Sequence, residues 1–250
     1  MKKIILHVII LLSSLSASEI YATFNIEAQK SANLAFYSSG IVEKIHVDVS
    51  SIVKKGDTLV ELQNDDVKAS LAMAKASLKN TEISLKFAKK DYERQLLIKD
   101  LIDEAKFDQY LLGFEKAKVA VIQAKANVAY QQSLLNRTFI NAPFDGIIFE
   151  KSVEVGDVVS GMMLRTIFKI QSLNERKLIF EYDQKYWKTV KIGDSVTYTV
   201  NGDVKLYKGK ISKIYPQANS DNRKIKAEIE AEGFIVGLFG DGTIITQNKK

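Results

Sequence analysis

The chain has 250 residues, 46% of them hydrophobic, a formal net charge of +6 and no cysteine. That length allows one or two ordinary domains or several small modules. The lack of cysteine excludes thiolate catalysis, disulfide bonds, cysteine-ligated zinc and lipid attachment at an N-terminal cysteine. Basic and acidic residues are mixed throughout, with no basic stripe among aromatic residues, so nucleic-acid binding is not indicated.

The N-terminus has the pattern of a secretory signal peptide. Lys2 and Lys3 precede an apolar run over residues 4–12, and small residues follow as far as Ala22. A charged, then apolar, then small-residue order is typical of export signals. The run is shorter than the roughly 20 residues that cross a bilayer. We expect residues 1–22 to be a signal peptide cut after Ser18 or Ala22, with an uncleaved anchor as the alternative.

One motif occurs twice. Residues 40–53 read GIVEKIHVDVSSIV and residues 146–159 read GIIFEKSVEVGDVV. Alternating Val and Ile predict strands, and Gly-Asp pairs mark turns. Two copies are too few for a solenoid. We expect one β-module built from residues 23–65, including N-terminal strands, and residues 138–173. Its motif residues are Gly40, Gly56, Asp57, Gly146, Gly156 and Asp157.

Residues 66–137, between the two copies, are predicted to be helical. They contain no proline, and apolar residues recur every seven positions in two series. Sustained heptads are typical of helices that pack along a narrow seam. A chain reversal near Lys99–Asp100 pairs Leu71 with Val128 and Tyr92 with Phe107, so we expect a long antiparallel helical hairpin. The seam residues are Leu71, Leu78, Leu85, Phe107, Phe114, Val121 and Val128.

Residues 174–246 are β-rich again, and 247–250 form a basic tail. Short strands separated by turns such as Gly193-Asp194 and Asn201-Gly202 predict a small β-barrel. The expected fold class is therefore mixed α+β, elongated and modular.

No catalytic constellation is evident. Beyond the expected signal peptide, His46 is the only histidine, which excludes Ser-His-Asp and Cys-His arrangements. There is no phosphate-binding Gly-rich loop. We expect no enzyme activity, no metal site and no cofactor. A biotinyl or lipoyl carrier domain is disfavoured because residues 66–137 occupy the turn that would present the modified lysine.

Together these features resemble the periplasmic adaptor proteins, or membrane fusion proteins, of the HlyD/AcrA family. The stretches that carry the resemblance are SSGIVEKIHVDVSSIVKKGDTLVELQ, INAPFDGIIFEKSVEVGDVVSGMML and RKIKAEIEAEG. It implies a lipoyl-like (barrel-sandwich hybrid) module interrupted by the hairpin. It also implies a periplasmic protein, held at the inner membrane by its partners, that bridges an inner-membrane transporter and an outer-membrane channel for efflux.

The resemblance most readily implies a transporter of the RND type and self-assembly, commonly as a hexameric ring. An adaptor of an ABC-type exporter or of type I secretion is the first alternative. A periplasmic coiled-coil scaffold or ligand chaperone is the second. Because the chain stops near the expected end of the barrel, we expect the family's membrane-proximal domain to be absent or minimal.

The resemblance also suggests binding residues. RND-type adaptors carry Arg-x3-Leu-x6-Ser at the hairpin tip, and the matching positions here are Tyr92, Leu96 and Asp103, of which only the leucine is retained. The channel-docking set is Tyr92, Arg94, Leu96, Lys99, Asp100, Leu101 and Asp103. The transporter-facing set is Arg223, Lys224, Gly237 and Gly240.

Overall fold

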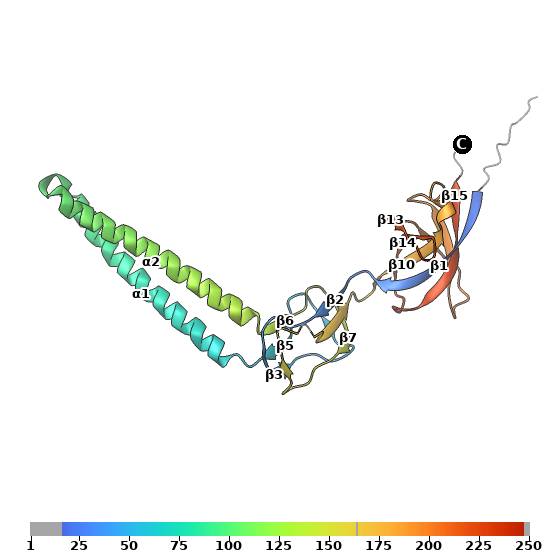
Figure 1. The fold of residues 1–250 in the computed structure, drawn as a ribbon, viewed down its shortest axis with the longest axis horizontal. Coiled ribbons are helices and arrows are strands. Elements are labelled where there is room, and N and C mark those ends of the chain that lie inside the picture. Colours follow the sequence, from blue (N-terminus) through green and yellow to red (C-terminus); the bar gives the residue numbers. More distant parts are fainter. Residues whose placement is uncertain (1–16, 164, 248–250) are drawn as a thin grey trace, which may run out of the picture. The chain divides into compact units, whose positions relative to one another are not determined.

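The structure, a computed structural model, describes residues 17–163 and 165–247 and is drawn in Figure 1. The chain divides into two compact units. The first, Ala32–Ile170, is called the hybrid unit. The second, called the barrel unit, is formed by the described residues up to Ser31 and from Gln171 onward.

Two four-stranded sheets form the β-part of the hybrid unit, in the orders β2-β9-β7-β4 and β6-β5-β3-β8. The internal repeat relates them, since β3 and β7 are equivalent, as are β4 and β8. The short strands are exchanged: β4 pairs with β7, and β8 pairs with β3. The strands are β2 (Ser31–Leu34), β3 (Gly40–Ile45), β4 (Ile52–Val53), β5 (Thr58–Leu62), β6 (Phe139–Asn141), β7 (Gly146–Lys151), β8 (Val158–Val159) and β9 (Phe168–Gln171).

The turn at Gly56-Asp57 is held by the second half of the repeat. Gly56 has φ 94°, which favours glycine, and the Asp57 carboxylate accepts a hydrogen bond from the Lys54 N–H at 2.8 Å. The Gly56 N–H donates to the Ala142 carbonyl at 2.8 Å, and the Ala142 N–H donates to the Asp57 carbonyl at 2.9 Å. One residue of the second half therefore fixes the turn of the first.

The turn at Gly156-Asp157 has the same arrangement with the roles of the halves exchanged, because here a residue of the first half holds a turn of the second. Gly156 has φ 93°, and Asp157 accepts from the Glu154 N–H at 3.1 Å. Gly156 donates to the Val42 carbonyl and Val42 donates to the Asp157 carbonyl, both at 2.9 Å. The two halves thus interlock. Gly40 and Gly146 lie opposite Val159 and Val53 in the exchanged pairs.

The pairing of β5 with β6 brings the ends of two long helices together. Helix α1 (Asp65–Leu96) begins just after β5, and α2 (Glu104–Asn136) ends just before β6. β5 and β6 run antiparallel, with Val60 opposite Ile140, so the two helices start and finish side by side. Buried Asn64 donates to the Thr138 hydroxyl at 3.1 Å across this junction.

Helices α1 and α2 lie side by side and contact each other (Figure 1). Leu71, Phe107 and Val121 are buried, whereas most residues between successive seam positions are exposed. Toward the far end, the Tyr92 ring lies 5.7 Å from Phe107 and 5.3 Å from Phe114, centroid to centroid. The remaining seam residues, Leu78, Leu85, Phe114 and Val128, are half-buried.

The barrel unit is one seven-stranded sheet in the order β12-β11-β15-β1-β10-β14-β13. Its edge strands, β12 and β13, are joined only by Ile211 and Ser212, and the Ser212 N–H donates to the Glu228 carbonyl on β14 at 2.9 Å. The sheet therefore curls around a core that includes Phe24 and Phe180. The elements are β1 (Ala17–Ala28), β10 (Glu175–Asp183), η2 (Gln184–Tyr186), β11 (Ser195–Val200), β12 (Tyr207–Lys210), β13 (Lys213–Ala218), β14 (Lys224–Glu232) and β15 (Phe239–Gln247).

Strand β1 differs from the sequence-based expectation. The sequence grouped the N-terminal strands with the first half motif and residues 174–246 alone with the barrel. The structure instead places β1 between β10 and β15, with Ile20 and Ala22 in the barrel core. The small residues up to Ala22 resemble a cleavage site. Within β1, however, the side chains alternate, so that Ile20 and Ala22 face the barrel core while Tyr21 faces solvent. A cut after Ala22 would remove half of this strand, whereas a cut after Ser18 would leave Ile20 in place.

The rest of the expected signal peptide, residues 1–16, lies outside the described residues, as do residues 248–250 of the basic tail.

We predict that Gly156→Ala destabilises the protein by about 1–2 kcal/mol, because an alanine must take a left-handed backbone conformation there. Gly113→Ala is the matched control. Gly113 lies in α2, with nothing within 4 Å of an added Cβ. That change should stabilise by roughly 0.5–1 kcal/mol. Urea unfolding of both variants provides the measurement. Equal stability of Gly156→Ala and wild type would show that the turn is not fixed as described.

Candidate functional site

The connection between α1 and α2 presents four apolar side chains to solvent. Leu97 is 86% exposed and Leu101 is 84% exposed, and Leu96 and Ile98 are about half as exposed, at 47% and 42%. A single turn, η1 (Lys99–Leu101), reverses the chain here. These residues lie beyond Tyr92, the last seam position of α1, so no facing helix covers them. We call Leu96, Leu97, Ile98 and Leu101 the tip patch.

Local contacts fix the start of α2 next to the tip patch. Asp103 is the N-cap residue of α2, and its carboxylate accepts from the Lys106 N–H at 3.3 Å. The Lys99 ammonium lies 5.1 Å from the centre of the Phe107 ring, at a cation–π distance. Arg94 forms an ion pair with Asp91. The tip patch is therefore displayed on a turn that these local contacts hold.

The expected channel-docking residues have different surroundings. Lys99, Asp100 and Leu101 are exposed on the turn, and Leu96 adjoins it. Tyr92 is half-buried and stacks on Phe114 inside the seam, so it supports the tip from within. Sequence reasoning missed Leu97 and Ile98, although apolar residues off the heptad and next to the reversal were the available signal.

The chemistry of the tip patch is that of a docking surface. A cluster of exposed apolar side chains rimmed by charged residues is typical of protein–protein contact sites. A few such side chains can supply most of an interface's binding energy when a partner groove buries them.

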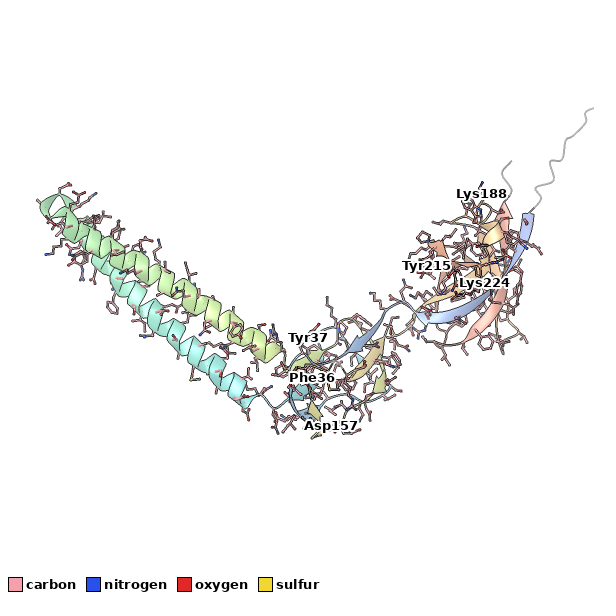
Figure 2. All side chains as sticks on the ribbon, in the orientation of Figure 1. Phe36, Tyr37, Asp157, Lys188, Tyr215 and Lys224 are labelled. Carbon is pink, nitrogen blue, oxygen red and sulfur yellow. The ribbon has the colours of Figure 1, made fainter. Side chains whose placement is uncertain are left out.

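The expected transporter-facing residues do not form one site. Arg223 and Lys224 lie on the half of the sheet where β1 begins: Lys224 is opposite Asp183, and the Arg223 carbonyl accepts from the Gln184 N–H at 3.0 Å. Figure 2 labels Lys224 and Tyr215 in this unit. Gly237, in contrast, donates to the Ile26 carbonyl at 2.9 Å, near the other end of β1.

Gly240 has a packing role. A Cβ at this position would lie 2.1 Å from the Thr199 carbonyl oxygen and 2.7 Å from the Phe24 ring. Only glycine therefore lets β15 approach its neighbours. Gly237, at φ 91°, serves a turn.

The charged groups of the hybrid unit form surface pairs. His46 Nε2 lies 3.6 Å from Glu61 Oε1, and the Lys44 ammonium lies 3.3 Å from the same oxygen. The hydrogen bond from Lys44 to Glu61 raises the pKa of Lys44. Among residues 17–163 and 165–247, no three His, Asp or Glu side chains are grouped so that they could hold a metal ion. Within the same residues, no helix is both long and apolar enough to cross a bilayer.

Comparison with known families identifies the chain's family. The model of the CzcB-like, barrel-sandwich hybrid domain matches residues 30–171, which is more than half of the 250 residues. The chain belongs to the CzcB-like barrel-sandwich hybrid family. The resemblance to membrane fusion proteins that the sequence indicates is thereby confirmed.

Two curated proteins are similar to this CzcB-like chain. The cobalt-zinc-cadmium resistance protein CzcB of Cupriavidus metallidurans is 24% identical over 80% of this chain and 39% of its own length. The multidrug resistance protein MdtA of Escherichia coli is 28% identical over 60% of this chain and 37% of its own length. The chain thus spans about two fifths of the length of these relatives.

A solved structure shares the fold. The crystal structure of MacA from Actinobacillus actinomycetemcomitans superposes with a TM-score of 0.77 at 24% identity, over 92% of this chain and 79% of that one.

We predict that Asp103→Ala costs about 1 kcal/mol of unfolding free energy, because the Lys106 N–H loses its acceptor at the first turn of α2. Asp103→Ser, which keeps a capping oxygen, should retain most of that stability. Chemical unfolding followed by helical circular dichroism measures both variants. Equal losses in the two variants would contradict a capping role.

Proposed function

We propose that this protein is a periplasmic adaptor of a tripartite efflux system, bridging an inner-membrane transporter and an outer-membrane channel. The observation that carries the proposal is the tip patch, four apolar side chains at the end of a long helix pair inserted into a barrel-sandwich hybrid module. In this proposal α1 and α2 act as a projecting antiparallel hairpin, and the tip patch docks the channel.

The energy for transport comes from the partner transporter. The sequence has no phosphate-binding loop that would bind a nucleotide. We favour a transporter of the RND type and assembly of the adaptor as a hexameric ring. An ABC-type exporter is the alternative, which identification of the co-purified transporter would decide.

The cargo is a small molecule or ion. The related proteins are named for cobalt, zinc and cadmium resistance and for multidrug resistance. We propose export of drugs or other small molecules. Cells lacking the gene should become more susceptible to at least one compound in a panel of antibiotics, dyes and divalent metal salts.

The transporter contact is assigned to Arg223 and Lys224. Both lie beside the β10–η2 junction of the barrel unit, and Arg223 is exposed. Gly237 and Gly240 are left out of this contact, since each has a backbone or packing reason to be glycine.

We predict that the double change Leu97→Asp and Leu101→Asp abolishes efflux in cells, because two charges cannot enter an apolar groove without a large desolvation cost. Leu112→Asp is the matched control, because Leu112 is 53% exposed on α2 away from the tip. All variants should unfold at nearly the wild-type temperature. Wild-type resistance in the double variant, at equal protein level, would contradict the docking role of the tip patch.

We also predict that Arg223→Glu with Lys224→Glu weakens co-purification of the inner-membrane transporter while leaving that of the channel unchanged. Reversed charge replaces attraction with repulsion at a protein surface of opposite sign. The readout is the ratio of the two partners recovered after crosslinking in cells. Selective loss of the channel would reverse the assignment of the two ends.

A further inference from the structure

One end of the barrel unit displays a tryptophan among lysines. Residues 184–193 read QKYWKTVKIG, with three lysines and no carboxylate. Trp187 is 61% exposed and Ile192 is 66% exposed, and Lys185, Lys188 and Lys191 are exposed beside them. We call these five residues the basic end face.

The basic end face is held in place from both sides. Val190 is buried in the barrel core, and its N–H donates to the Tyr186 carbonyl at 3.1 Å. After Ile192, the Gly193 N–H donates to the Ile211 carbonyl at 2.8 Å, and Ile211 donates back to the Asp194 carbonyl at 3.0 Å. Trp187 therefore faces solvent from a fixed segment and is not part of a loose loop.

The two nearby carboxylates have partners within the same segment, and the Lys185 ammonium lies 3.9 Å from the Asp183 carboxylate. Asp183 accepts from the Lys185 N–H and Asp194 accepts from the Lys191 N–H, each at 2.8 Å. The Lys188 ammonium lies 5.0 Å from the centre of the Trp187 ring. Within residues 17–163 and 165–247, neither Lys188 nor Lys191 forms an ion pair, so their charges are available to an anionic partner.

The chain also enters the barrel unit at this end. Glu19 of β1 lies opposite Ile245 of β15, which lies opposite Ser195, the residue that follows the Gly193-Asp194 turn. Figure 2 shows Lys188 near the start of β1. In the sequence, residues 13–16 alone separate Ala17 from the apolar run 4–12. The five Cα–Cα steps from Leu12 to Ala17 span at most about 18 Å, so in the uncleaved protein this end lies near any bilayer that holds the run.

We propose that the basic end face binds the surface of an anionic phospholipid bilayer directly. Tryptophan favours the headgroup level of membranes, where its ring is partly buried and its N–H stays hydrated. Each lysine near an anionic surface strengthens binding roughly fivefold. Separate apolar side chains between exposed lysines fit a fluid lipid surface that adapts to them. The inference needs no transport partner and stands independently of the proposed function.

Tryptophan fluorescence reports on the basic end face directly, because Trp187 is the only tryptophan in the chain. The purified full-length protein is titrated with vesicles of phosphatidylglycerol and phosphatidylethanolamine, and separately with phosphatidylcholine vesicles. We expect a blue shift of Trp187 emission, and quenching by brominated acyl chains, with the anionic vesicles only. Raising the salt concentration should weaken both, because salt screens the lysine charges.

Lys188→Glu with Lys191→Glu should weaken binding to anionic vesicles by at least about 20-fold, since two favourable charges are reversed. The matched control is Lys30→Glu with Lys205→Glu, which makes the same charge change at exposed lysines of the barrel unit outside the face. Both variants retain Trp187 and have the same N-terminus as the wild type, so the comparison isolates the face. Circular dichroism checks that they fold.

Three results would overturn the proposal. The first is no blue shift with anionic vesicles at low salt. The second is equal binding by wild type and Lys188→Glu/Lys191→Glu, which would assign membrane binding to another segment. The third is a Trp187 shift that needs the purified transporter, which would assign the face to a protein partner. None of these results bears on the tip patch, because the test of the tip patch measures efflux in cells.

Discussion

The mutual docking of two Gly-Asp turns is the constraint on which the hybrid unit depends. Gly156 and Asp157 are held by Val42, and Gly56 and Asp57 are held by Ala142, through paired backbone hydrogen bonds of 2.8–2.9 Å. Each half therefore supplies the partner that the other half's turn requires. Because β5 and β6 come from different halves and pair antiparallel, a long insertion between them must leave and return at one place. The two helices are that insertion.

The same turn supports the barrel unit. Gly193, at φ 93°, and Asp194 dock on Ile211 as the other two turns dock on Val42 and Ala142. In the hybrid unit the turns secure the base of the helix pair, and in the barrel unit the third turn secures the segment that carries Trp187. The backbone that carries the exposed apolar side chains at the tip and at the basic end face is held by local hydrogen bonds, which lowers the ordering cost of binding.

Sequence patterns predicted the parts of the fold that local periodicity encodes. Heptad spacing picked out Leu71, Phe107 and Val121 as seam residues, and all three are buried. The repeated Gly-Asp pairs marked turns, and both glycines have positive φ. The membership of β1 was not predictable in this way, because its partners are distant strands around Phe180 and Ile244. A local alternation of small and apolar residues fits both a cleavage region and a buried strand.

The expected binding residues also divide into those that a local sequence pattern identifies and those whose surroundings depend on distant contacts. Leu96 occupies a position of the family motif, whereas Leu97, which is more exposed, lies outside that motif. Tyr92 occupied a motif position, yet its ring is used inside the seam. The sequence alone could not show that Gly237 and Gly240 have backbone or packing roles, whereas Arg223 and Lys224 do not. That distinction requires the pairing of β15 with its neighbouring strands.

The most direct measurement is photocrosslinking in living cells, with a photoreactive amino acid placed at Leu101, at Lys224 or, as a control, at Leu112, followed by identification of the captured proteins. A two-ended adaptor predicts that position 101 captures an outer-membrane channel protein, that position 224 captures an inner-membrane transporter, and that position 112 captures neither. Capture of the same protein at positions 101 and 224, or of nothing but other copies of this chain, would contradict the bridging role.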